Sequence, residues 1–262
     1  MMDVLIEGCR PFYFKGKARL LSVVAPKSGI KHARIFDSVF ELDIEDHVQR
    51  HLYWGTFEHY EMRLVQQYLR PGMTFVDVGA NIGCYTALGA RQVAGNGGRV
   101  ISFEPSSHAF EKLQSMVRGN KLEHVTVVNA GLSDTAGPRK LYLDPRFHNH
   151  TPTMVAHGNE HATATEVAVT TLDDEAARLG IGQIDLIKID VEGYEPKVLG
   201  GARRMLNEGR IRAILCEFDE GWLRKGGSST RELENFIRDA GFVDRNYPGM
   251  LRFFQLPDGR MK

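Results

Sequence analysis

Short hydrophobic runs of strand length alternate with amphipathic stretches of helix length along most of the chain. The pattern predicts strands at residues 74–79, 99–104, 124–129, 185–190, 211–218 and 251–256. It predicts helices at residues 84–94, 107–119, 172–179, 196–207 and 229–240. Strands separated by helices pair in parallel through right-handed crossovers, so we expect a doubly wound α/β sheet.

The first 58 residues follow a more irregular pattern. Strands are favoured there by three apolar stretches, Phe12 to Phe14, Leu20 to Val24 and Val39 to Ile44. Helical spacing of apolar residues from His59 to Leu69 then leads into the regular alternation. We therefore expect a small β-rich appendage with a cofactor-covering segment at residues 1–58, followed by an α/β domain at residues 59–262.

Composition limits the classes of partner. The 262 residues include 33 basic and 33 acidic side chains, and this balance argues against a general attraction to nucleic acid or to anionic membranes. The three cysteines, Cys9, Cys84 and Cys216, are too scattered for a disulfide framework, which favours a reducing compartment. No apolar run reaches bilayer length, so we expect a cytoplasmic protein. A homodimer is compatible with the sequence, which leaves the oligomeric state open.

Polar and small residues gather at the predicted strand ends. In a doubly wound sheet the ligand lies at the carboxyl ends of the strands, so these segments are expected to meet in one crevice. They are Asp77 to Gly79, Glu104 with Pro105, Ala130 with Gly131, Asp190 to Glu192, and Glu217 to Asp219.

The turn after the first of these strands carries Gly79, Ala80, Asn81 and Gly83. Small residues before a helix let backbone amides approach an anionic group, although a tight turn without a ligand has the same sequence. The dinucleotide pattern GxGxxG fails at its third glycine, because Cys84, Tyr85 and Thr86 follow. A pyrophosphate ligand is therefore less favoured than another nucleotide-like ligand.

Several motifs in order resemble a known family. The stretches DVGANIG at 77–83, FEPS at 103–106, IKIDVEGYE at 187–195 and VLGGA at 198–202 resemble the FkbM family of S-adenosylmethionine-dependent methyltransferases. The resemblance covers roughly residues 54 to 243. It implies a class I methyltransferase fold, a Rossmann-like sheet of order 3-2-1-4-5-7-6 whose last strand is antiparallel.

The resemblance also implies where the cofactor S-adenosylmethionine would lie. Its methionine part would lie over the first turn, its ribose hydroxyls would meet Glu104, and its adenine would lie beside the second and third strand ends. Glu58 and Phe57 would cover it, although a surface acid beside a core aromatic residue explains that pair equally well. The cofactor-binding residues expected on this basis are Glu58, Asp77, Gly79, Ala80, Asn81, Gly83, Thr86, Glu104, Pro105, Ser106, Ala130, Gly131 and Asp190.

Transfer of a methyl group to an alcohol needs a general base near the methyl. We expect Asp190, Glu192 and Glu217 to supply it, since a desolvated carboxylate in a cleft can have a raised pKa. Acids at a helix N-terminus are also favoured by the helix dipole, and we prefer that explanation for Glu195. No metal is expected, although Mg²⁺ held by Asp190, Glu217 and Asp219 is a minor alternative.

Other chemistry-bearing residues receive weaker assignments. Four of the ten histidines lie at 148–161. We prefer to interpret this segment as a solvated loop, next as a lid over the substrate with His148 or His150 as base, and last as a metal site. Cys84 and Cys216 are expected to pack as small hydrophobic residues. Trp222 is left outside the site because large aromatic residues more often pack in a core.

The resulting hypothesis is an S-adenosylmethionine-dependent O-methyltransferase that acts on a hydroxyl of a small molecule, a sugar or a secondary metabolite. The chain lacks an NPPY-like segment after the fourth strand, and this absence argues against a methyltransferase of nucleic-acid amino groups. Two alternatives remain open, a nicotinamide-dependent oxidoreductase and a non-catalytic cofactor-binding module.

Overall fold

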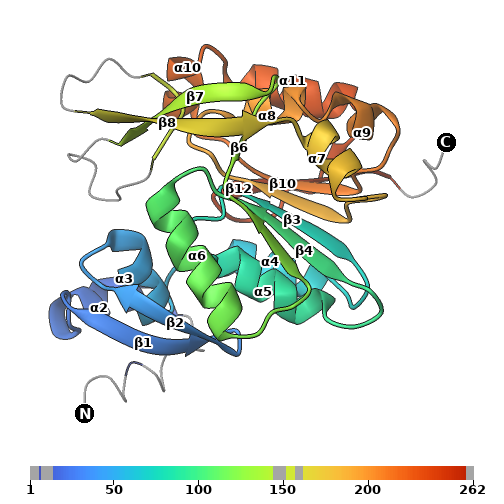
Figure 1. Ribbon diagram of the computed structural model, residues 1–262. Coiled ribbons are helices and arrows are strands. Elements are labelled where there is room, and N and C mark those ends of the chain that lie inside the picture. The colour runs from blue at the N-terminus through green and yellow to red at the C-terminus, as the bar shows by residue number, and fades with distance from the viewer. Residues whose placement is uncertain (1–5, 7–13, 144–151, 157–161, 258–262) are drawn as a thin grey trace.

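The computed structural model of the protein describes Ile6 and residues 14–143, 152–156 and 162–257 (Figure 1). A central seven-stranded sheet has the order β11-β12-β10-β9-β3-β4-β5. Its strands are β3 (Thr74–Val78), β4 (Arg99–Phe103), β5 (Val125–Val128), β9 (Leu186–Ile189), β10 (Ala213–Glu217), β11 (Val243–Asp244) and β12 (Leu251–Gln255).

The connectivity of this sheet confirms the predicted fold. Pairs among β5, β4, β3, β9 and β10 are parallel, whereas β12 runs antiparallel to both β10 and β11. Counted along the chain, the seven strands have the order 3-2-1-4-5-7-6, and the seventh is the antiparallel strand. The predicted strand boundaries agree with the observed ones to within two residues.

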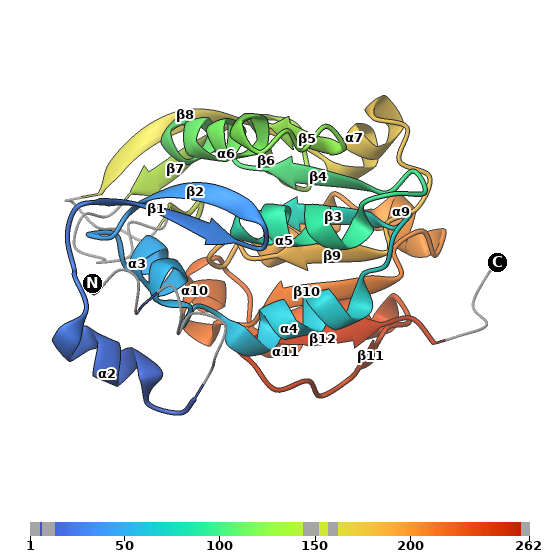
Figure 2. The ribbon, with the colours of Figure 1, turned by 90° about the horizontal axis from the view of Figure 1, so that it is seen from below.

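Helices cover both faces of the sheet (Figures 1 and 2). One face carries α4 (His59–Tyr68), α5 (Cys84–Val93) and α6 (Ser107–Gly119). The other carries α7 (Leu172–Arg178), α8 (Glu195–Gly200), α9 (Arg203–Asn207), α10 (Glu220–Lys225) and α11 (Thr230–Asp239). None of the helices within the described ranges combines the length and apolar character needed to cross a bilayer.

The period of two along each strand divides the core into these two layers. Phe75 on β3 belongs to the hydrophobic cluster with α4, α5 and α6, whereas its neighbours Val76 and Val78 belong to the cluster on the opposite face. On β10, Leu215 and Cys216 divide in the same way. Both faces of the parallel strands are buried, which explains their nearly continuous apolar sequences.

The N-terminal part differs from the prediction at two helices, since neither α2 nor α3 (His47–Trp54) was predicted. Leu20 to Val24, predicted as a strand, lies in the helix α2 (Lys17–Val24), because lysine, alanine, arginine and leucine favour a helix and Leu21 alone of this stretch is fully buried. The strand predicted at Val39 to Ile44 is confirmed as β2 (Ser38–Asp43), which pairs with β1 (Ile30–Ile35). Phe12 and Tyr13 lie outside the described residues.

The helix α3 (His47–Trp54) completes the N-terminal elements. Residues of β2 and α3, among them Leu42, Leu52 and Trp54, are buried in the same cluster as α4 and α5. The domain boundary at residue 58 stays a prediction.

Further elements of the α/β domain differ from the prediction, among them the short α10 and β11, which were not predicted. The helix expected at 196–207 is divided into α8 and α9 around Gly201. A Cβ atom at Gly201 would lie 2.0 Å from the carbonyl oxygen of Ser133, so only glycine fits there. A three-stranded sheet with the order β6-β8-β7 was not predicted. Its strands are β6 (Gly131–Leu132), β7 (Gly137–Leu143) and β8 (Thr163–Thr170). The alternating sequence of β8 was the available signal for it.

The packing of α5 on β3 yields a stability prediction. A Cβ atom at Gly89 would lie 2.2 Å from Cδ1 of the buried Phe75 ring. Gly89→Ala is therefore expected to lower the free energy of unfolding in urea by about 1–3 kcal/mol through overpacking. Gly119→Ala is the matched control, because its Cβ meets nothing within 4 Å, and it should be neutral or stabilising by up to about 1 kcal/mol. Equal effects of the two variants would contradict the packing argument.

Candidate active site

A cavity of about 490 Å³ lies at the carboxyl ends of β3, β4, β9 and β10. The structure brings most of the sequence-predicted site residues together in its wall. Those that line it are Phe57, Glu58, Gly79, Ala80, Asn81, Glu104, Pro105, Gly131, Asp190, Glu192 and Glu217. The strand ends that form the wall are far apart in the sequence, and parallel pairing places them at one edge of the sheet.

Five predicted site residues lie behind this wall and do not line the cavity: Asp77, Gly83, Thr86, Ser106 and Ala130. Asp77 and Thr86 are fully buried, and the Thr86 hydroxyl donates to Oδ2 of Asp77 at 2.7 Å. Ser106 caps the N-terminus of α6, where its side chain accepts from the backbone N–H of Ala109. These groups support the wall.

The glycines of the first turn make room for protein atoms. A Cβ at Gly79 would lie 2.1 Å from the carbonyl oxygen of Asp190, and a Cβ at Gly83 would lie 2.5 Å from Cε of Met116. Both residues have positive φ angles, which glycine adopts without strain. These glycines therefore allow the end of β9 and the helix α6 to approach the turn closely.

The backbone amides of this turn already have acceptors within the protein. Gly79 and Ala80 both donate to the carbonyl oxygen of Phe103, and Gly83 donates to that of Ala80. Asn81 donates to Oε2 of Glu104 at 2.8 Å. The sequence suggested that amides of this turn approach an anionic group of a ligand, and that assignment stays a prediction. In this structure the amides of Gly79, Ala80, Asn81 and Gly83 bond to protein acceptors, which fix the turn and orient Glu104.

Glu104 is held from both sides. Its Oε2 accepts from Asn81 and its Oε1 accepts from the backbone N–H of Ser106 at 2.9 Å. Burial raises the pKa of Glu104 to about 7, although the two backbone donors act in the opposite direction. A carboxylate oxygen has two lone pairs, so each oxygen keeps one for a further donor such as a hydroxyl of a bound ligand.

Lys188 is the residue that the sequence analysis missed. Its Nζ lies 3.1 Å from Oδ2 of Asp190, 3.8 Å from Oδ1 of Asp77, and donates to the carbonyl oxygen of Gly79 at 3.1 Å. The side chain is only 3% exposed. Burial alone would lower the pKa of Lys188, but the neighbouring carboxylates outweigh it and raise the pKa. The sequence did contain a signal for this residue, since Lys188 stands inside the apolar strand IKI and a buried charge needs a partner.

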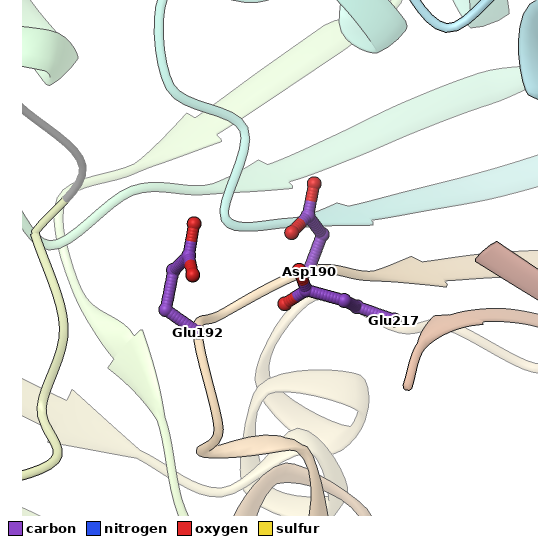
Figure 3. A group of neighbouring side chains, drawn as sticks. All are labelled: Asp190, Glu192 and Glu217. Atoms are coloured by element: carbon purple, nitrogen blue, oxygen red, sulfur yellow. The ribbon is translucent and has the colours of Figure 1, made fainter. Parts of the chain in front are cut away.

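Three carboxylates, those of Asp190, Glu192 and Glu217, lie close together at the strand ends (Figure 3). One oxygen each of Asp190, Glu192 and Glu217 lies within 4.8 Å of the others. Burial raises the pKa of Glu192 and of Glu217, and repulsion by Asp190 raises both further. Oε2 of Glu217 is buried and has no hydrogen-bond partner among the described residues.

The same three oxygens would suit a hard cation. This group differs from the alternative Mg²⁺ set that the sequence suggested, since Glu192 takes the place of Asp219 in it. Asp219 lines the cavity and caps α10, where its side chain accepts from the N–H of Trp222.

Glu195 holds the turn that carries Glu192. It lies in the first turn of α8, as expected from the sequence, but it is buried there. Its Oε1 accepts from the backbone N–H groups of Val191 and Gly193, at 3.1 and 3.2 Å. Burial raises the pKa of Glu195 to about 7.

Glu58 reaches the cavity from the segment before α4. It accepts a hydrogen bond from the Tyr85 hydroxyl, and its backbone has a φ of 35°. Burial raises the pKa of Glu58, and repulsion by Asp190 adds to this effect.

Further lining residues escaped the sequence analysis. Trp222, which was left outside the site, lines the cavity, as do His47, His51 and Met250. Burial lowers the pKa of His51 to about 4. No pattern in the sequence singled out these side chains. His148 and His150, considered as alternative bases, lie outside the described residues, while Cys84 and Cys216 are buried free thiols.

The strand order and the cavity at the carboxyl ends of the strands define a class I methyltransferase fold. The family model described as "Methyltransferase FkbM domain" matches residues 77–243. The chain belongs to this FkbM methyltransferase family, which confirms the resemblance seen in its motifs.

Named relatives include the "31-O-demethyl-FK506 methyltransferase FkbM" of Streptomyces tacrolimicus, 30% identical over 57% of this chain and 66% of that protein. The "Hexuronic acid methyltransferase AglP" of Haloferax volcanii is 27% identical over 64% of this chain and 67% of that protein. The crystal structure of a methyltransferase FkbM from Methylobacillus flagellatus has 18% identity and a TM-score of 0.47, covering 79% of this chain and 52% of that chain.

The position of Lys188 yields a second stability prediction. Lys188→Met leaves Asp77 and Asp190 without their buried cation, so the free energy of unfolding should fall by about 3–5 kcal/mol in urea denaturation. Lys197→Met is the control, because the Lys197–Asp134 pair is largely exposed and contributes at most about 1 kcal/mol. A loss no larger than that of the control would show that the buried ammonium does not compensate these acids.

The raised carboxyl pKa values predict how stability depends on pH. The folded protein retains protons on Glu192 and Glu217 at pH values where the unfolded chain has lost them, so it binds more protons than the unfolded chain. The free energy of unfolding should therefore fall as pH rises from about 6.5 to about 8.5. His51 acts with the opposite sign, but only below its usual pKa of 6.5.

Urea midpoints across this pH range test the sign. Glu217→Gln should flatten the slope, whereas Glu123→Gln, at an exposed position, should leave it unchanged. Stability that rises with pH in the unsubstituted protein would contradict the assignment.

Proposed function

We propose that this protein transfers a methyl group from S-adenosylmethionine to a hydroxyl on a small molecule, a sugar or a secondary metabolite. The supporting observation is the convergence of Asp190, Glu192 and Glu217 at the wall of a cavity that Glu104 also lines, in a chain of the FkbM methyltransferase family.

The chemistry of the cavity fits the proposed donor. Glu104 retains acceptor capacity for two ribose hydroxyls, and Pro105 and Gly131 lie in the wall where the adenine would pack. The turn at Gly79 to Asn81 would offer a bare surface to the methionine part, with its amides already satisfied. Acidic lining residues match the net positive charge of the donor, and Glu58 would close the cavity from the opposite side.

S-adenosylmethionine, when bound, supplies a methyl group on positively charged sulfur, and it leaves as a neutral thioether once the carbon–sulfur bond has been replaced by a carbon–oxygen bond. The acceptor hydroxyl loses its proton in this exchange, and we assign that proton to the carboxylates of Asp190, Glu192 and Glu217. Desolvation raises the proton affinity of Glu192 and Glu217, so either accepts the proton readily once it is in its ionised form. Glu195 would position Glu192 through the turn.

Oxygen as the acceptor atom is supported by the name of the Streptomyces relative, which specifies a position 31-O. Membership in a methyltransferase family favours methyl transfer over the nicotinamide-dependent alternative. The cluster of desolvated acids favours catalysis over a binding module, because such a cluster costs stability and needs a compensating role. The balanced charge of the chain provides no general attraction to nucleic acid, which supports a small-molecule or glycan acceptor.

Ligand-induced thermal shifts test the proposed donor. S-adenosylhomocysteine should raise the melting temperature, whereas NAD should not, since only a bound ligand stabilises the folded state by mass action. Glu104→Ala should weaken the affinity for S-adenosylhomocysteine in calorimetry by at least about tenfold, through loss of hydrogen bonds to a charged acceptor. Glu123→Ala, on the exposed surface, is the control and should retain the full affinity. A melting temperature that NAD raises and S-adenosylhomocysteine does not would contradict the proposal.

A further inference from the structure

We propose that the carboxylates of Asp190, Glu192 and Glu217 make the cavity select its ligand by charge, so that it binds the sulfonium donor more tightly than the neutral thioether product. Loss of the positive charge in the reaction would then itself promote product release. This inference rests on the proposed function and concerns regulation of the same site.

The cavity has a large excess of acids. Among the described residues, its charged or titratable lining side chains are Glu58, Glu104, Asp190, Glu192, Glu217, Asp219, Lys188, His47, His51, Cys84 and Tyr85. Asp77 and Glu195 add two buried acids directly behind the wall. Six lining carboxyl groups therefore face one lysine, and the low pKa of His51 leaves its ring uncharged at neutral pH.

The charge of Lys188 acts on the whole cluster, but its ion pairs within the described residues are with Asp77 and Asp190. Its ammonium bonds to Asp190 and to the carbonyl oxygen of Gly79, and it faces Asp77. Glu192 and Glu217 have no ion-pair partner within the described part of the chain. The buried Oε2 of Glu217 also lacks a hydrogen-bond donor there. Burial favours the protonated form of these two glutamates in the empty cavity, so a cationic ligand would bind them as carboxylates with release of their protons, whereas a neutral ligand would leave them protonated.

The cluster lies next to the turn that the donor would cover. The carbonyl oxygen of Asp190 is in contact with Gly79, whose missing side chain would lie 2.1 Å from it. A sulfur atom carried over this turn would therefore lie near the carboxylates. Charges a few ångströms apart interact strongly where water is partly excluded, whereas a neutral thioether gains nothing from them. Donor and product otherwise differ by one methyl group.

Calorimetry with three ligands separates charge from shape. S-adenosylmethionine should bind about tenfold or more tightly than S-adenosylhomocysteine, a difference that one partly screened charge pair can supply. Sinefungin carries an ammonium in place of the sulfonium methyl, so it should bind like the donor although it has no methyl to transfer. EDTA in every titration keeps metal ions from neutralising the carboxylates.

Two variants locate the effect. Glu217→Gln should reduce the preference for S-adenosylmethionine toward unity while leaving the affinity for S-adenosylhomocysteine unchanged or improved. This variant keeps the size of the side chain and removes a carboxyl group whose ionised form burial and neighbouring acids disfavour, so it should fold. Glu123→Gln, at an exposed position, should keep the full preference. The preference should persist at high salt, because buried charges are weakly screened.

The outcomes are distinct from those that test the proposed function. Equal affinity for the three ligands, or tighter binding of S-adenosylhomocysteine, would overturn the charge selection and leave the donor assignment intact. Tight binding of S-adenosylmethionine together with weak binding of sinefungin would also overturn it, because the methyl group and not the charge would then be recognised. Failure of all three ligands to bind would overturn the proposed function and this inference together.

Discussion

The buried ammonium of Lys188 connects the parts of the site to one another. It bonds to the carbonyl oxygen of Gly79 on one side and to the carboxylate of Asp190 on the other, and so joins the turn after β3 to the end of β9. It is also the only cation that faces the fully buried Asp77 within the described residues. The position of the first turn and the charge of the acid cluster thus depend on one side chain.

The first turn transmits this constraint to the second strand end. Gly79 allows the carbonyl of Asp190 to approach, and the amides that follow bond to Phe103 and to the side chain of Glu104. Because the amides have acceptors within the protein, the turn acts by orienting a carboxylate. The glycine-rich sequence therefore encodes close packing of three strand ends, and the ligand-binding groups are the side chains held by that packing.

Local sequence patterns were sufficient to predict the central sheet, but they did not predict all the residues of the site. Each strand of the sheet is an apolar run between helices, so its existence and its direction follow from periodicity and connection rules. The carboxylates were found for the same reason, since they stand at strand ends. Lys188 was missed because a single charge inside an apolar run does not indicate which residues will pair with it. Its partners are Asp77 on β3 and Asp190, which follows β9. Leu20 to Val24 was misassigned because the buried face of α2 contains Lys17 and only one large apolar residue, Leu21, so its sequence carries a weak helical pattern. Trp222 and His51 reach the cavity only through tertiary packing.

Backbone strain at Glu58 and Glu192 supports a functional role for the acids that line the cavity. Glu58 and Glu192 have φ angles of 35° and 53°, in the left-handed region that costs a residue other than glycine roughly 1–2 kcal/mol. Among the described residues, Asn81, Asn96 and Asn246 also have positive φ, and asparagine tolerates this conformation. The remaining non-glycine residues of this kind, Phe36, Asp37 and Lys121, lie in turns outside the cavity. Glutamate has no such tolerance, and both strained glutamates line the cavity, where burial also raises their pKa values. Strain and desolvation oppose folding at these two positions together. Strain of this kind concentrates where a site requires a fixed geometry, and here it aims two carboxyl groups into one cavity.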